Sequence, residues 1–392
     1  MKQAILFCLL LMIHSIVSAQ SPPLSDARWQ PLTSTNAHAL SLVYEVDLSS
    51  ILPSMSIIDI DLVSYSGVFF ISYLDLSVNQ GGWMLWDSQS QQPILEQLII
   101  AKQQLDGFLF SPYGKFLVIR TDEASNFDIT ETCLWHISSG EKLHCWDTTI
   151  FDMQFTHDEQ TLILAGANQV IGWDIQKNIA RFTIPQLAVS IAISPDDTNL
   201  ILDRTDSIFI WNIQTDTPYE IQRQILDDKV IVEELTLDIL GRYVFFNTIS
   251  LFSSGEIELG ILDISSNTIT YIEREVIPQD FFSSQYVRLF LFKQPDSAIA
   301  DIIDPITGAN YGTTTRFMLR DNTLAQDIFI AREEVINGLF TYSVKNFETQ
   351  ETLITLYENS HDRRLNIQFT PDERFILTYT EEGIVQMWGV IN

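Results

Sequence analysis

The sequence predicts an all-β fold built from similar four-stranded sheets, and three observations support this. From about residue 37 to the end, short apolar segments alternate with polar turns, and helical periodicity is almost absent. Several of these segments align with one another by eye. A tryptophan, or another residue in its place, recurs near the end of every third strand at a regular spacing. A repeated β unit therefore organises the chain.

The composition is that of a folded, strongly acidic protein. Of the 392 residues, 46% are hydrophobic, 11% are aromatic and only 19% are charged, which is too apolar for a disordered chain. The 51 acidic residues outnumber the 22 lysines and arginines, and the formal net charge is -29. Binding to nucleic acid or anionic lipid depends on clustered basic residues, so the composition argues against both partners.

The first residues resemble an export signal that lies outside the fold. Lys2 precedes the apolar stretch Ala4–Val17, and Val17-Ser18-Ala19 offers the small residues that signal peptidase recognises. The competing interpretation is a membrane anchor, but this stretch is shorter than the roughly 20 residues that a spanning helix needs. We expect a signal peptide over residues 1–19, cleaved after Ala19, and a location in the periplasm, the cell envelope or the medium. No later stretch is long and apolar enough to span, so we expect no transmembrane segment after cleavage.

Residues 20–36 read as a polar linker, and residues 37–392 contain the repeat. Each clear copy has an apolar strand, a polar turn containing Pro, Asp or Gly, and a second apolar strand: "FSPYGKFLVIR" from Phe110, "FTHDEQTLILAG" from Phe155, "ISPDDTNLILDR" from Ile193 and "FTPDERFILTYT" from Phe369. A third strand then ends on an anchoring residue, at Trp86, Trp135, Trp173, Trp211 and Trp388, with weaker copies at Leu262, Ile303 and Tyr342.

The spacing of these anchors predicts a β-propeller. It averages about 43 residues, within the roughly 40–45 of a four-stranded propeller blade. Eight anchors predict eight blades; seven is the alternative, if the poorly patterned region 279–313 is an insertion. Only four residues follow Trp388, so the last blade lacks its outer strand. The alternating segment Ala39–Leu48 is predicted to supply that strand and close the propeller.

From about residue 37 to its end, the chain resembles the WD-repeat β-propeller family. The resemblance is strongest at Trp86-Asp87 and Trp173-Asp174, fair at the other three tryptophans, and poor between Gly241 and Leu356. The family's glycine–histidine dipeptide is missing from every copy, so we expect the hydrogen-bonded tetrad that uses this histidine to be absent. A β-sandwich is the alternative fold, but sandwiches show no tryptophan-anchored period along the whole chain.

The segment "TCLWHISSGEKLHCWD" predicts a hairpin that places Cys133 opposite Cys145. Directly opposed residues of such a hairpin lie close enough for a disulfide, and an exported chain favours one over two free thiols. His136 and His144 lie in the same hairpin and suggest a zinc site. Strand alternation places Cys133 and His136 on opposite faces, and likewise His144 and Cys145, so we expect no metal there. Both histidines are then expected to face solvent.

Acid pairs recur in the turns between first and second strands, at Asp158-Glu159, Asp196-Asp197 and Asp372-Glu373. In a propeller these turns would emerge on one face and form an acidic rim. Such a rim could bind cations or a basic partner, but solvated turns that keep the protein soluble are the interpretation we favour. None of these turns has the spacing of a calcium-binding loop.

Candidate partner-binding residues lie on the opposite face, in the loops between second and third strands. These loops are long at 122–131 and 247–256, and the segment "IPQDFFSSQ" precedes the sixth repeat. Apolar side chains in polar loops on a rigid scaffold suit partner binding, although packing back onto the fold is equally compatible. The candidates are Phe127, Leu251, Phe252 and Phe282.

No catalytic, cofactor-binding or phosphate-binding motif is present in the sequence. The resemblance therefore implies a non-enzymatic scaffold that binds an unidentified protein or peptide, and we expect a monomer without cofactor or metal. The alternative is a propeller enzyme, resembling a lactonase or a quinone-dependent dehydrogenase, with a site at the mouth of the central channel. Three or more acids, asparagines or histidines converging there would favour the enzyme.

Overall fold

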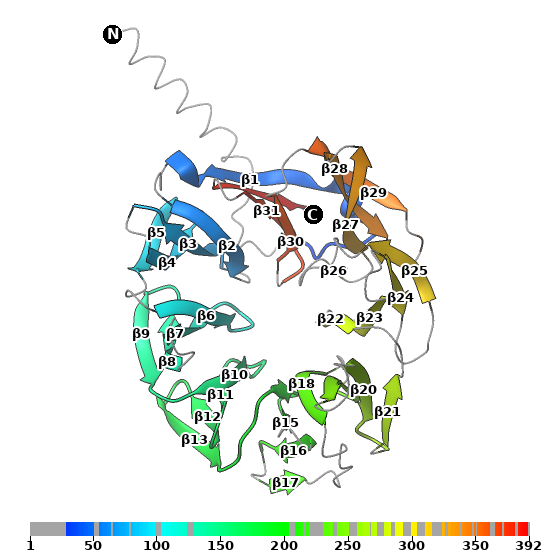
Figure 1. Ribbon diagram of the computed structural model, residues 1–392. Coiled ribbons are helices and arrows are strands. Elements are labelled where there is room, and N and C mark those ends of the chain that lie inside the picture. The colour runs from blue at the N-terminus through cyan, green and yellow to red at the C-terminus, as the bar shows by residue number, and fades with distance from the viewer. Residues whose placement is uncertain are drawn as a thin grey trace, which may run out of the picture. The chain divides into compact units, whose positions relative to one another are not determined.

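The fold is all-β and consists of small antiparallel sheets with four strands each (Figure 1). The structure, a computed structural model, describes residues 29–50, 55–63, 66–77, 80–98, 103–123, 129–203, 208–214, 217–219, 230–237, 241–250, 257–266, 268–272, 278–283, 287–292, 299–303, 310–315, 324–325, 328–336, 339–346, 349, 351–360, 365–370, 372–380 and 383–390. No helix within these ranges has the length and apolar character needed to cross a membrane.

The strands of the first four sheets follow one another along the chain. Sheet 1 contains β2 (Met55–Val63), β3 (Val68–Asp75), β4 (Gln80–Asp87) and β5 (Gln92–Leu98). Sheet 2 contains β6 (Gln103–Phe110), β7 (Phe116–Glu123), β8 (Ile129–His136) and β9 (Glu141–Trp146). Sheet 3 contains β10 (Ile150–Phe155), β11 (Thr161–Gly166), β12 (Val170–Asp174) and β13 (Ile179–Ile184). Sheet 4 contains β14 (Ile191–Ile193), β15 (Asn199–Asp203), β16 (Ile208–Asn212) and β17 (Thr217–Tyr219).

The remaining four sheets include one that uses both ends of the chain. Sheet 5 contains β18 (Val230–Leu237), β19 (Tyr243–Ser250), β20 (Ile257–Asp263) and β21 (Thr268–Ile272). Sheet 6 contains β22 (Pro278–Ser283), β23 (Val287–Phe292), β24 (Ile299–Ile303) and β25 (Asn310–Thr315). Sheet 7 contains β26 (Leu324–Ala325), β27 (Ile328–Ile336), β28 (Leu339–Asn346) and β29 (Thr352–Ser360). Sheet 8 contains β30 (Asn366–Phe369), β31 (Phe375–Tyr379), β32 (Ile384–Gly389) and β1 (Ser41–Asp47).

The strand assignment agrees with the predicted repeat. All eight anchors lie on the third strand of their sheets, from Trp86 on β4 to Trp388 on β32. Residues 278–315 contribute four strands of the same pattern, as the eight-repeat interpretation requires. The architecture of repeated four-stranded antiparallel sheets is consistent with propeller blades.

The chain divides into two compact units. One holds residues 1–99, 327–346 and 351–392, and with them sheets 1 and 8 and the strands β27–β29. The other holds residues 100–326 and 347–350, and with them sheets 2–6. Within each unit the apolar core lies between consecutive sheets: one cluster joins sheets 8 and 1, and three more join sheets 2 and 3, sheets 3 and 4, and sheets 4 and 5.

Burial follows this stacking. The second strand of a sheet is covered on both faces, so β11 and β31 are buried at every residue and read as continuous apolar runs. The fourth strand β13 is exposed along most of its length. The tryptophan of the third strand packs toward the preceding sheet: Trp86 in the cluster between sheets 8 and 1, and Trp173 against the cluster between sheets 2 and 3.

Strand β1 completes sheet 8, as the sequence predicts. It pairs antiparallel with β32 from Ser41 opposite Gly389 to Asp47 opposite Ile384, and Figure 1 shows it in blue beside the dark red C-terminal strands. The strand is shorter than the segment 39–48, because the 3-10 turns η1 (Ala37–Ala39) and η2 (Leu48–Ser50) flank it.

Residues before β1 also pack on sheet 8, although they belong to the segment read as a linker. Trp29 is buried with its ring 5.1 Å from that of Phe375, and the backbone N–H of Leu32 donates to the carbonyl of Glu373 at 2.8 Å. The apolar side chains of this segment therefore extend the core between sheets 8 and 1 toward the N-terminus.

Deleting residues 39–48 is expected to destabilise the protein strongly. The deletion leaves β32 with an unpaired edge and removes the buried side chains of Val46 and Leu48 from the core. We expect a fall in melting temperature of about 10 °C or more, since each kcal/mol lost lowers it by a few degrees. The control is Leu42→Ser, because this side chain is 43% exposed and its loss leaves the strand pairing intact. Equal melting temperatures for the deletion and the intact chain would disprove closure by β1.

Candidate functional site

Four turns between first and second strands share one hydrogen-bonded conformation. They begin with a Ser or Thr whose backbone N–H donates to a residue five positions later, and their fourth residue has a positive φ. The first residues are Ser111, Thr156, Ser194 and Thr370. The fourth residues are Gly114, Glu159, Asp197 and Glu373, with φ between 55° and 69°. Acidic residues therefore occupy a left-handed position that usually favours glycine or asparagine.

The first acid of each pair caps its own turn. Asp158 accepts a hydrogen bond from the hydroxyl of Thr156 at 2.7 Å and from the backbone N–H of Gln160 at 2.9 Å. Asp196 and Asp372 make the equivalent bonds in sheets 4 and 8. The hydrogen bonds from the Ser194 and Thr198 hydroxyls stabilise the ionised form of Asp196 and lower its pKa.

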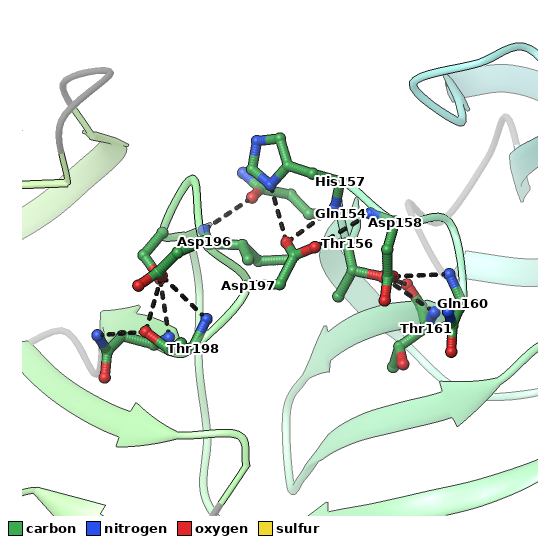
Figure 2. Close-up of polar contacts among 12 residues, drawn as sticks. Gln154, Thr156, His157, Asp158, Gln160, Thr161, Asp196, Asp197 and Thr198 are labelled. Atoms are coloured by element: carbon green, nitrogen blue, oxygen red, sulfur yellow. Dashed lines mark hydrogen bonds and ion pairs between the residues drawn. The ribbon is translucent and has the colours of Figure 1, made fainter.

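The second acid binds the turn of the preceding sheet. Asp197, in sheet 4, accepts the backbone N–H of His157 at 2.8 Å and that of Asp158 at 3.0 Å, and its Oδ1 lies 2.8 Å from the His157 Nδ1 (Figure 2). Sheet 4 is thereby connected to sheet 3 by a carboxylate that accepts hydrogen bonds from two backbone amides.

Glu159, in sheet 3, makes the same connection to sheet 2. It accepts the hydroxyl of Ser111 at 2.5 Å and the backbone N–H of Tyr113 at 2.6 Å. An ion pair with Lys115 at 3.1 Å completes its surroundings, and Glu159 is only 4% exposed. Donors of the protein itself thus bind these acids, and the second acids Glu159 and Asp197 connect neighbouring sheets.

The first strands of neighbouring sheets are joined by side chains as well. Gln154 on β10 donates to the carbonyl of Ile191 on β14 at 2.8 Å and accepts the N–H of Ile193 at 3.2 Å. Asp152 accepts the N–H of Ile191 at 2.8 Å, and burial raises its pKa. Strands β10 and β14 belong to different sheets and do not pair through their backbones. These side-chain hydrogen bonds connect them instead.

The equivalent glutamine of sheet 8 meets a pair of carboxylates. Gln368 on β30 donates to the carbonyl of Ile60 and to Asp61 Oδ1, both at 2.9 Å. Two residues earlier on β2, Asp59 accepts the hydroxyl of Tyr379 at 2.6 Å. Burial and, to a smaller extent, the nearby charge of Asp59 raise the pKa of Asp61 to about 7, whereas the bond from Gln368 opposes the shift. Asp59 and Asp61 are called the carboxylate pair below.

The predicted disulfide is present. Cys133 on β8 and Cys145 on β9 are directly opposed, with their Cα atoms 4.1 Å apart, and their sulfurs are bonded. The bond joins the third and fourth strands of sheet 2. Glu131 lies near both sulfurs, but a sulfur already in a disulfide is not the thiolate that a metal site needs.

The two histidines of this hairpin do not behave alike. His136 Nδ1 lies 2.9 Å from the Ser139 hydroxyl in the exposed turn. His144 instead packs against two indoles, with its ring centroid 4.1 Å from that of Trp173 and 4.7 Å from that of Trp146. The expectation that both face solvent is therefore wrong for His144, and desolvation lowers its pKa. Its ring belongs to the packing between sheets 2 and 3.

The candidate partner-binding residues are only partly located. Phe127, Leu251 and Phe252 lie outside the described residues. Phe282 lies on β22, opposite Arg288 of β23, so it belongs to the first strand of sheet 6 rather than to a loop.

Sequence reasoning missed the residues that join the sheets. Gln154 and Gln368 occur in the matching segments "DMQF" and "NIQF", and this repeated Gln-Phe pair was the available signal. The carboxylate pair has no such signal in the sequence, because the hydrogen-bond partners of Asp59 and Asp61 come from sheet 8 at the other end of the chain. Figure 2 shows that the two acids of one pair have different partners. Asp196 binds its own turn, whereas Asp197 binds the turn of the preceding sheet.

The indole groups of two tryptophan anchors pack against the apolar clusters between sheets. Among the described residues, the indole N–H groups of Trp173 and Trp211 are buried without a hydrogen-bond partner. Comparison of the chain with protein-family models and with curated protein sequences finds no match. The chain is an all-β protein of several small antiparallel four-stranded sheets, and no family is identified for it.

Replacing Asp197 by glycine is expected to destabilise the protein by about 1–3 kcal/mol, because two backbone amides of sheet 3 lose their acceptor. Glycine suits the left-handed backbone there, so the loss reports the missing carboxylate and not strain. Asn178→Gly is the matched control, since Asn178 has the same φ of 55° in an exposed turn of sheet 3. Urea unfolding should separate the two variants, and equal midpoints would contradict the contact.

Removing the disulfide with Cys133→Ser and Cys145→Ser is expected to cost at most about 3 kcal/mol, because the closed loop is short. The loss should be smaller than that caused by deleting β1. Mass spectrometry of the unreduced protein should show no alkylatable thiol at either position. Two freely alkylated cysteines would count against both the bond and its physiological role.

Proposed function

We propose that the protein is an exported, divergent WD-repeat-like β-propeller in which the eight sheets are blades of one closed structure. Support comes from the tryptophan anchor on each clear third strand, and from β1, which supplies the fourth strand of the C-terminal sheet. Covering each small sheet on both faces requires neighbours on both sides, and a closed ring of blades satisfies this for every sheet. Export rests on residues 1–19 and is tested by the N-terminus of protein isolated from its host, expected at Gln20.

We further propose that the propeller is a non-enzymatic scaffold that binds a protein or peptide. One observation carries this proposal: the turns at one end of the sheets are held by contacts between sheets, as with Asp197 and Glu159. The loops at the opposite end of the sheets are then attached to a rigid structure. They lose little conformational entropy when a partner binds, which favours binding. Phe127, Leu251 and Phe252 lie on these other loops in the sequence.

Two described residues support a binding role for that end. Ile58 on β2 and Phe151 on β10 sit at β-bulges near the start of the first strand, and are 61% and 39% exposed. The strand registers place both at the end of the sheet where the second strand turns into the third. Bulges redirect side chains and often accompany functional surfaces.

The test compares capture by the mature protein and by a Phe127→Ser, Phe252→Ser double variant. Cross-linking in the envelope fraction of the native host, followed by mass spectrometry, should identify a partner retained by the wild type and lost by the double variant. Ile179→Ser is the matched control, because this side chain is 54% exposed on the fourth strand β13 and should not affect capture. The melting temperatures of all three proteins should agree.

Two outcomes would contradict the scaffold. Retention of the same partner by the double variant would remove the proposed surface, and a large fall in its melting temperature would make the phenylalanines packing residues. Turnover of a lactone, or quinone-dependent oxidation of an alcohol or sugar, by the purified protein would favour the enzyme alternative. That activity should then survive the double substitution, because the alternative places its site at the channel mouth.

A further inference from the structure

The carboxylate pair lies where the N-terminal and C-terminal sheets of the chain meet. Asp59 and Asp61 are two residues apart on β2 and project from the same face of the strand. Both bind sheet 8: Asp59 accepts from Tyr379 on β31, and Asp61 accepts from Gln368 on β30. Sheet 8 is also the sheet that β1 completes. The pair therefore belongs to the contact on which closure of the chain depends.

The donors that face the pair are neutral. Gln368 offers an amide and Tyr379 a phenol, and the neighbouring strand β3 places Ser72 and Phe70 opposite the two aspartates. No lysine, arginine or histidine is among these facing groups in the described part of sheets 1 and 8. Two other acids with buried side chains have a cationic neighbour: Glu159 pairs with Lys115, and Asp372 with Arg374. Two like charges on one strand face, without a cation, repel each other and are poorly solvated.

We propose that this contact is a proton-dependent clasp, in which one proton held by the carboxylate pair keeps sheets 1 and 8 together and its loss loosens them. With a proton bound, the pair carries a single negative charge, which the amide and the phenol can solvate by hydrogen bonds. With both carboxylates ionised, the same two neutral donors face two negative charges. Repulsion between the two carboxylates then weakens the contact between sheets 1 and 8. It acts beside the hydrogen bond that Gln368 donates to the backbone of β2.

The direction of the pH effect follows from the raised pKa of Asp61. A carboxyl group whose pKa is higher in the folded state binds its proton more tightly there than in the unfolded chain. Its stabilising effect is complete below the ordinary pKa of 3.8 and is lost as the pH rises toward and through about 7. The ratio of folded to unfolded protein should thus fall by about one to three orders of magnitude across this range, from this group alone.

The experiment measures melting temperature against pH for the full mature chain and two variants. Asp61→Asn keeps the acceptor for Gln368 and removes the titration, so its melting temperature should fall much less between about pH 5 and pH 8 than that of the wild type. Asp47→Asn is the control: this exposed residue on β1 contacts Ser49, and its substitution should leave the wild-type profile in place. Equal pH profiles for Asp61→Asn and the wild type would overturn the clasp.

A second pair of measurements locates the effect. Asp59→Asn removes the neighbouring charge but leaves Asp61 to titrate, so the transition should persist with its midpoint at lower pH. This variant also decides the question if Asp61→Asn does not fold, because an unchanged midpoint would exclude coupling within the pair. Hydrogen exchange, corrected for its intrinsic pH dependence, should show protection lost first in β2, β30 and β31 as the pH rises. Uniform loss over all sheets would assign the effect to the net charge of the protein and overturn the proposal.

Discussion

A four-stranded sheet with two apolar faces must be covered on both, and this constraint explains most of the structure. Strands β11 and β31 are buried along their whole length, which is possible only with a neighbouring sheet on each side. The apolar core is consequently a series of layers between sheets rather than a single centre. A layered core of this kind leaves no sheet stable alone, so the first and last sheets of the chain must also find partners.

Apolar layers alone do not fix how one sheet is placed on the next, and polar side chains supply that specificity. Asp197 and Gln154 both bind backbone groups of a neighbouring sheet, one in the first turn and the other on the first strand. Hydrogen bonds have directions that hydrophobic contact lacks, so these bonds select one arrangement of the stacked sheets. Because carboxylates are the acceptors, a very acidic chain can devote some of its excess acids to structure.

The repeat was predictable from sequence because its signals are local. The third-strand tryptophans, the pairing of β1 and the opposed cysteines all follow from spacing and alternation within short segments. The contacts between sheets were not predictable in this way, since they join residues about forty positions apart or at opposite ends of the chain. His144 illustrates the limit: alternation gives its face, but only the structure shows that Trp173 of the next sheet covers that face.

The acids at the contacts between sheets are also of two kinds, as Glu159 and Asp61 show. Glu159 accepts hydrogen bonds from a hydroxyl and a backbone amide and forms an ion pair with a lysine. Asp61 has an amide donor and a second carboxylate nearby, so burial is not offset by opposite charge. Backbone amides thus bind the acids of the turns in sheets 3 and 4, whereas the acids of β2 meet sheet 8 through two neutral side-chain donors. Strand β1 brings the N-terminal end of the chain into the C-terminal sheet, and the contact between sheets 1 and 8 holds the carboxylate pair.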